Sequence, residues 1–145
     1  MSRSRSERGS VAIETMFAIG FLLIPAAALL SQLPGWVGTS HAAHAAAVEA
    51  ARQVVLADTM AEGVAEAQRA AADVISNHGL DTADLLDVEV SAVPAGALQR
   101  GQEVTVTVTV SGNPIVVPGL GSVGNPFNAV GGATERVDDY RSLGR

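Results

Sequence analysis

Residues 10–38 read SVAIETMFAIGFLLIPAAALLSQLPGWVG, and this apolar stretch decides the fold. Its richest part, residues 16–33, holds 18 residues, which is about the minimum that crosses a hydrocarbon core as a helix. No formally charged residue lies between Thr15 and Val48, whereas arginines precede the stretch and an acidic chain follows it. We therefore expect one membrane span, with the N-terminus in the cytoplasm and the C-terminal domain outside it.

Glu14 is an ionisable residue inside this stretch. A carboxylate in a bilayer costs a few kcal/mol, about 3 on insertion scales, so such a residue indicates a functional site and needs a partner. Gly9 stands five positions before it. If a peptidase cuts after Gly9, Ser10 becomes the first residue, Glu14 becomes the fifth, and a free amine arises at the cytoplasmic edge of the membrane. An amine and a carboxylate that pair would offset the cost of burying either charge alone.

Two plainer interpretations of the same N-terminus stay open. It is a secretory signal peptide that is removed, or an anchor that is never cleaved. A signal peptide seldom carries an acid in its apolar core, and the nearest small-x-small site, at residues 26–28, is followed by more leucine. Neither interpretation accounts for Glu14.

The spacing Gly9-xxxx-Glu14 resembles the class III leader of type IV pilins and pseudopilins. Within that group, RGSVAIE at residues 8–14 looks most like the TadE-like minor pseudopilins of tight-adherence (Flp, type IVb) pilus systems. The segments AAVEAARQVV, residues 46–55, and ATERVDDYRS, residues 133–142, are similar to the helix after the span and to the last strand of such chains. Two positions depart from the pattern, since many relatives carry a proline where this chain has Gly20 and an aromatic residue where it has Thr15.

The resemblance implies a structural assembly protein rather than an enzyme. A prepilin peptidase would cut between Gly9 and Ser10, and Glu14 would pair with the N-terminal amine of a neighbouring subunit. The implied partners are that peptidase, other pilins and pseudopilins, and the Tad assembly machinery, and the implied location is the cell membrane or a surface pilus. The alternative is an uncleaved single-pass accessory protein of a secretion or envelope system.

Composition excludes some functions. The chain has 145 residues, of which 48% are hydrophobic, and no cysteine, so neither disulfides nor thiolate metal sites are available to it. Its formal net charge is −6, and loss of residues 1–9 removes three Arg and one Glu, which takes the charge to −8. Nucleic-acid binding is not expected, because contacts to phosphates need clustered cations.

Beyond the span we expect a helix break at residues 33–35 and then one Ala-rich helix over residues 38–79. Pro25 is expected to kink the membrane helix over residues 10–37, because it cannot donate to the Phe21 carbonyl. Residues 56–75 form an amphipathic pattern of helical period. Its apolar positions are Leu56, Met60, Val64, Ala67, Ala71, Val74 and Ile75, and its charged positions are Asp58, Glu62, Glu66, Arg69 and Asp73. Arg69 is expected to pair with Glu66 and with Asp73, and Gly79 to end the helix in a left-handed conformation.

Residues 80–145 are predicted to form a small antiparallel β domain with a Gly/Pro-rich loop at 112–132. In residues 87–93 and 103–110, apolar and polar residues alternate with period two. This pattern predicts two strands, which the hairpin loop 94–102 joins. Residues 115–117 are a candidate third strand and the tail from 133 to 141 a last one. The predicted fold is α+β and pilin-like, with the helical stripe covering the valine face of a sheet of three or four strands.

The loop contains Gly119, Gly121 and Gly124 at GxGxxG spacing. A dinucleotide site needs a helix directly after such a motif, whereas here Asn125, Pro126 and more glycine follow. We expect no nucleotide cofactor.

Metal sites are not expected either. His41 and His44 lie three apart on one helical face but lack a third ligand of fitting spacing, so they are interpreted as surface or interface residues. Asp81, Asp84 and Asp87 miss the alternation and the closing Glu of a calcium loop and are interpreted as capping and turn residues.

Overall fold

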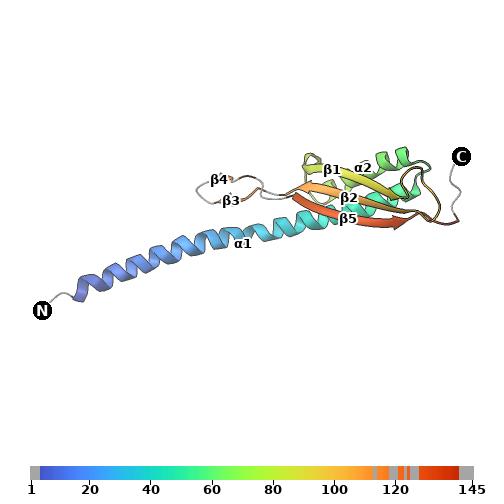
Figure 1. The fold of residues 1–145 in the computed structure, drawn as a ribbon. Coiled ribbons are helices and arrows are strands. Elements are labelled where there is room, and N and C mark those ends of the chain that lie inside the picture. Colours follow the sequence, from blue (N-terminus) through green and yellow to red (C-terminus); the bar gives the residue numbers. More distant parts are fainter. Residues whose placement is uncertain (1–3, 113, 118–120, 123, 125–127, 141–145) are drawn as a thin grey trace. The chain divides into compact units, whose positions relative to one another are not determined.

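The computed structural model describes residues 4–112, 114–117, 121, 122, 124 and 128–140, without the side chains of residues 4–10, 12 and 117. The protein is α+β, with a long N-terminal apolar helix, a second helix and a three-stranded antiparallel sheet (Figure 1). It divides into two compact units, one formed by Met1–Pro34 and Pro114–Gly124 and the other by Gly35–Asn113 and Asn125–Arg145. The second unit holds the sheet, and we call it the α+β unit.

Helix α1, Ser4–Leu56, contains both prolines of the apolar stretch. The predicted break at residues 33–35 is wrong, because the helix continues through Pro34 and Gly35. Each proline removes only one backbone hydrogen bond, and helix formation on either side is cooperative. Nearby hydroxyls add local bonds, since Ser31 Oγ donates to the Ala28 carbonyl and Thr39 Oγ1 donates to the Gly35 carbonyl at 2.7 and 3.0 Å.

The helix break lies instead at residues 57–59, so the single helix predicted over 38–79 is two helices. Helix α2, Met60–Asn77, is capped at its N-terminus by Thr59, whose side chain accepts a hydrogen bond from the Glu62 N–H at 3.2 Å. That bond satisfies one of the unpaired donors of the first turn. Gly63 then allows α2 to pass close to α1, since a Cβ there would lie 3.1 Å from Val54 Cγ1. After α2, Gly79 adopts φ +75°, as predicted.

The sheet has the strand order β1-β2-β5, all antiparallel. A short 3₁₀ helix, η1 (Thr82–Asp84), leads into β1, Leu85–Val93. Strand β2, Glu103–Ser111, is the central strand, and β5, Asn128–Arg136, is its other neighbour. The pairing of β2 with β5 is regular from end to end, whereas that of β1 with β2 shifts between Leu85 and Asp87.

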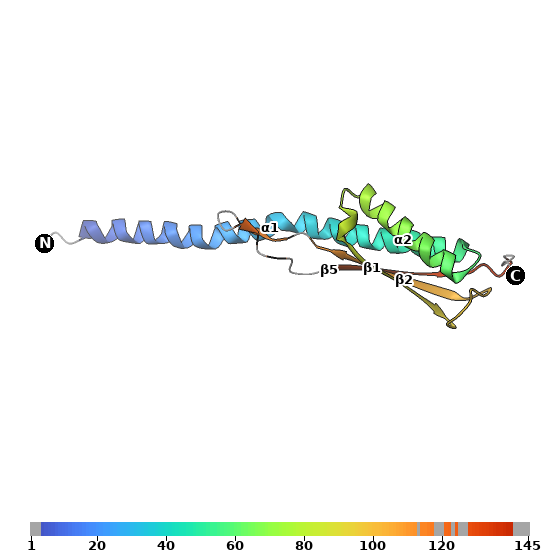
Figure 2. The ribbon, with the colours of Figure 1, turned by 90° about the horizontal axis from the view of Figure 1, so that it is seen from above.

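One face of the sheet carries the core of the α+β unit. The valines of β2 that alternate with threonine are fully buried: Val104, Val106, Val108 and Val110. Against them pack α2 and the C-terminal part of α1, which lie on the same side of the sheet (Figure 2). From α2 come Ala67, Ala71 and Ile75, and from α1 come Ala42, Ala43, Ala46, Ala47, Ala50, Ala51 and Val54. Leu56, which the sequence pattern placed on the buried stripe, is 56% exposed at the end of α1.

Strand β5 begins five residues before the strand expected at residue 133, and Gly131, in the added part, lies against α1. A Cβ on Gly131 would lie 2.3 Å from the carbonyl carbon of Ala43, so the backbones of β5 and α1 are in direct contact. Glycine is the residue that permits such an approach. A glycine pair that suggested a loop is therefore part of the sheet.

The other described part of the Gly/Pro-rich segment forms a separate two-stranded ladder. Strand β3, Val116–Val117, pairs with β4, Gly121–Ser122. Residues 115–117 thus supply a strand, as the sequence suggested, but it does not join the main sheet.

Candidate functional site

The N-terminal part of α1 presents large apolar side chains on all sides. Met16 and Phe17 are each 77% exposed and Phe21 is 86% exposed. In the described part of the chain this is the one helix long and apolar enough to cross a membrane, and none of its most apolar 18-residue window is buried. Since Ala42–Ala51 include many buried residues, that window lies before them. The chain is compatible with a single-pass membrane protein.

Gly9, Ser10 and Glu14 all lie in the first turns of α1. Residues 1–3 and the side chains at positions 4–10 are outside the described part. Glu14 is exposed and forms no hydrogen bond or ion pair with a described side chain, whereas the next residue, Thr15, donates from Oγ1 to the Val11 carbonyl at 2.7 Å. Helical side chains tilt toward the helix N-terminus. The Cα–Cβ bond of Glu14 therefore tilts toward the N-terminal end of α1, and its exposed side chain is accessible to a second chain.

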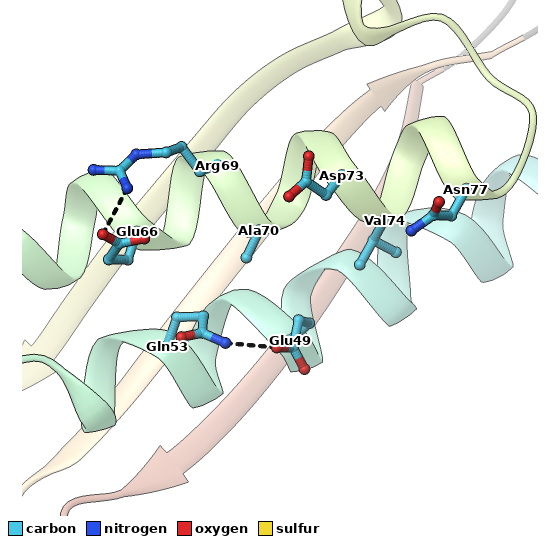
Figure 3. Close-up of a pocket in the computed structure, with 8 residues that line it drawn as sticks. All are labelled: Glu49, Gln53, Glu66, Arg69, Ala70, Asp73, Val74 and Asn77. Atoms are coloured by element: carbon cyan, nitrogen blue, oxygen red, sulfur yellow. Dashed lines mark hydrogen bonds and ion pairs between the residues drawn. The ribbon is translucent and has the colours of Figure 1, made fainter.

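A groove of about 610 Å³ lies between α1 and α2 on the surface of the α+β unit (Figure 3). Its lining residues are mostly polar: Glu49, Gln53, Glu66, Arg69, Ala70, Asp73, Val74 and Asn77. Arg69 pairs with Glu66 at 2.6 Å as predicted, but the expected pair with Asp73 is not among the ion pairs of the described residues. The groove presents half-buried and exposed carboxylates and amides and, among the residues that line it, no serine, threonine, histidine or cysteine to act as a nucleophile.

Glu49 bonds to residues three and four positions later on α1, Arg52 and Gln53. The sequence analysis does not predict these bonds, although residues at this spacing are neighbours on a helix surface. Arg52 donates to Glu49 from Nε and from Nη2, at 3.0 and 2.9 Å, and Gln53 donates to it at 2.7 Å. These bonds, first that of Arg52 and then that of Gln53, lower the pKa of the Glu49 carboxyl, which lies beyond the apolar stretch 16–33. The network fixes the surface of α1 next to the groove.

The remaining candidates separate in the structure. His41 and His44 are exposed on α1, one turn apart. Asp81 caps η1, because its Oδ1 accepts from the Ala83 N–H at 2.9 Å, which agrees with the capping interpretation. Among the described residues, no group of three His, Cys, Asp or Glu side chains is placed to hold a metal ion.

The GxGxxG spacing does not sit in a nucleotide-binding context in the described residues. Gly119 lies outside them, Gly121 is in β4, and Gly124 has φ +59° and accepts from the Ile115 N–H. The next described element is strand β5, not a helix. A dinucleotide fingerprint places the N-terminus of a helix at this point.

Comparison with protein-family models, with curated proteins and with solved structures found no match to this chain.

Proposed function

We propose that this chain is a TadE-like minor pseudopilin, a subunit that is inserted in the membrane through α1 and assembled into a pilus through the same helix. The observation that carries the proposal is the placement of Glu14. It is an exposed carboxylate in the first turns of an apolar helix, five residues after a glycine and without a described partner in its own chain. A buried acid needs a compensating charge, and the amine of a cleaved neighbour supplies one.

The architecture beyond the span supports the proposal at a coarser level. A single long apolar helix continues into a unit in which its own C-terminal part, α2 and a three-stranded sheet share one core. That arrangement is compatible with a membrane anchor followed by a folded α+β unit, which is what the resemblance to pseudopilins implies. In the proposed topology the N-terminus is cytoplasmic and the α+β unit lies outside the membrane.

Processing is the first test. The full-length chain is expressed in cells that contain a prepilin peptidase, extracted from the membrane, and its intact mass and N-terminal sequence are determined. The expected mature chain begins at Ser10. Gly9→Val should leave the precursor uncut, because a β-branched side chain obstructs the approach of the protease to the backbone. Ser6→Val is the matched control and should be processed normally.

A mature chain that starts at Met1 or Ser2 would instead favour the uncleaved single-pass accessory protein.

Assembly is the second test. Glu14→Ala should permit insertion in the membrane but reduce cross-linking to pilus subunits, whereas Thr15→Ala should leave cross-linking intact. Unchanged cross-linking of Glu14→Ala would remove the role proposed for the carboxylate.

A further inference from the structure

Within the α+β unit, one face of α1 is covered and the opposite face is open. The covered face is the alanine face, whose six members are fully buried. The open face carries Val37, His41, His44 and Val48, of which Val37 is 54% and Val48 is 41% exposed. At 3.6 residues per turn these four positions fall within an arc of about 60°. We call them the Val-His-His-Val seam.

The spacing of the seam is that of a coiled coil. Successive members are four, three and four residues apart, which matches the d, a, d and a positions of a heptad repeat. Such positions of two parallel helices meet layer by layer, so that each residue faces its own copy. The seam is only two heptads long and has histidines at its centre, and polar residues at these positions lower the stability of a pair.

The two histidines offer half of a metal site. Both imidazoles are exposed and neither forms a hydrogen bond or ion pair with a described residue. Side chains three apart on a helix lie on the same face, and imidazole is a preferred ligand of Zn²⁺, which takes four ligands in a tetrahedron. Because the described part of one chain supplies no third ligand, the site is incomplete without a second chain.

We propose that two copies of this chain pair in parallel along the Val-His-His-Val seam and bind one Zn²⁺ through His41 and His44 of each copy. A second copy fits better than an unrelated partner for two reasons. Copies with one membrane span insert in the same direction, which places both histidine pairs at the same height above the membrane. The seam also carries no acid or arginine, so identical seams meet without repulsion between such charges.

The metal is what makes this pairing stable. Without Zn²⁺, the two central layers place polar imidazoles against each other and leave only the layers of Val37 and Val48 to pack. With Zn²⁺, one ring nitrogen of each of the four imidazoles is ligated and the two helices are cross-linked. The seam is present in the mature and in the uncleaved chain alike, so the result of a zinc-binding test is separate from that of the processing test at Gly9.

The test uses the full-length chain in detergent micelles. Native mass spectrometry, with and without added ZnCl₂, measures both the oligomeric state and the bound metal. We expect a monomer after treatment with EDTA and a dimer with one Zn²⁺ per two chains after zinc is added. His41→Ala or His44→Ala should each weaken zinc binding by more than the roughly 10- to 100-fold typical of losing an outer-shell partner. The double variant should lose the zinc-dependent dimer.

His78→Ala is the matched control, because His78 is the third histidine of the chain, is exposed at the C-terminal cap of α2, and is not part of the seam. It should keep the zinc-dependent dimer, and circular dichroism should show that all variants retain the fold. One Zn²⁺ per monomer without dimerisation would overturn the inference. A zinc-dependent dimer that survives in the double variant, or an oligomeric state that does not respond to zinc, would overturn it as well.

Discussion

Two regions of one helix are apolar in different ways. Before Pro34, α1 carries Phe, Met, Leu and Ile, most of them more than half exposed; from Gly35 to Leu56 its apolar residues are mainly alanines, and six of these are fully buried. A large apolar side chain gains the most free energy when it leaves water, as it would in lipid, because it removes a large apolar area from water. The small ones allow another backbone to come close. Hydrophobicity alone does not separate these two uses of a helix, but side-chain size does.

The contact between Ala43 and Gly131 shows most clearly how small residues allow two backbones to come close. Neither residue has a side chain beyond Cβ, so the helix and the strand touch through their backbones. Gly131→Ala would place a Cβ 2.3 Å from the Ala43 carbonyl carbon, and neither backbone has room to yield. We expect a loss of stability at the upper end of the overpacking range, about 3 kcal/mol or more. Urea unfolding of the full chain in detergent, followed by circular dichroism, measures it.

Gly132→Ala is the matched control for that change. Gly132 is the next residue of β5, points to the opposite face of the sheet, and has no atom within 4 Å of its ideal Cβ. Its φ is not positive, so alanine is tolerated and restricts the unfolded chain. We expect unchanged or slightly higher stability. Equal losses at the two positions would show that close approach is not the reason for glycine at position 131.

One substitution made in both regions tests the comparison directly. Ala46 is fully buried against the sheet, whereas Ala27 is exposed in the apolar stretch. Ala46→Leu should destabilise the α+β unit by about 1–3 kcal/mol, because the added atoms overfill a packed core. Ala27→Leu should leave the urea midpoint unchanged and retain membrane insertion. The same unfolding measurement covers both variants, and a tolerated Ala46→Leu would mean that the alanines are not required for close packing.

The elements that follow periodicity could be predicted from the sequence, and those that depend on close approach could not. The alternation in residues 103–110 gave the central strand and its buried valines, because period two is a local property. Glu14 stood out because an acid is rare in an apolar run. In contrast, the local sequence places Gly131 and Gly132 in a loop, since nothing local shows that a helix some 90 residues earlier in the chain contacts Gly131. The break predicted at Pro34 is wrong because a long helix tolerates one missing backbone hydrogen bond that a short helix would not.

Thr59 lies in the short connection between α1 and α2 and caps the N-terminus of α2. The sequence Thr59-Met-Ala-Glu62 has the spacing of a capping box, a signal that was available but was hidden by the continuous amphipathic pattern across residues 56–75. Thr59→Ala should lower the free energy of unfolding by about 1 kcal/mol, because the Glu62 N–H loses its acceptor. Thr59→Ser keeps the hydroxyl and should recover most of it. Urea midpoints of the three proteins decide the point, and an alanine variant as stable as the serine variant would contradict the capping role.

The smallest effect is expected on the solvated side of the buried region of α1, at Glu49. Its pKa in the folded protein is lowered from the usual 4.5 by the bonds from Arg52 and Gln53, so the unfolded chain binds the proton more readily. The stabilisation is therefore complete above pH 4.5 and is lost as pH falls through the lowered pKa. Because the pair is largely exposed, salt screens it, and Glu49→Gln should cost little at neutral pH. The informative measurement is the difference in urea midpoint between wild type and Glu49→Gln at pH 7 and at pH 3. It should shrink at pH 3, and a difference that grows on acidification would show that Glu49 acts through packing rather than charge.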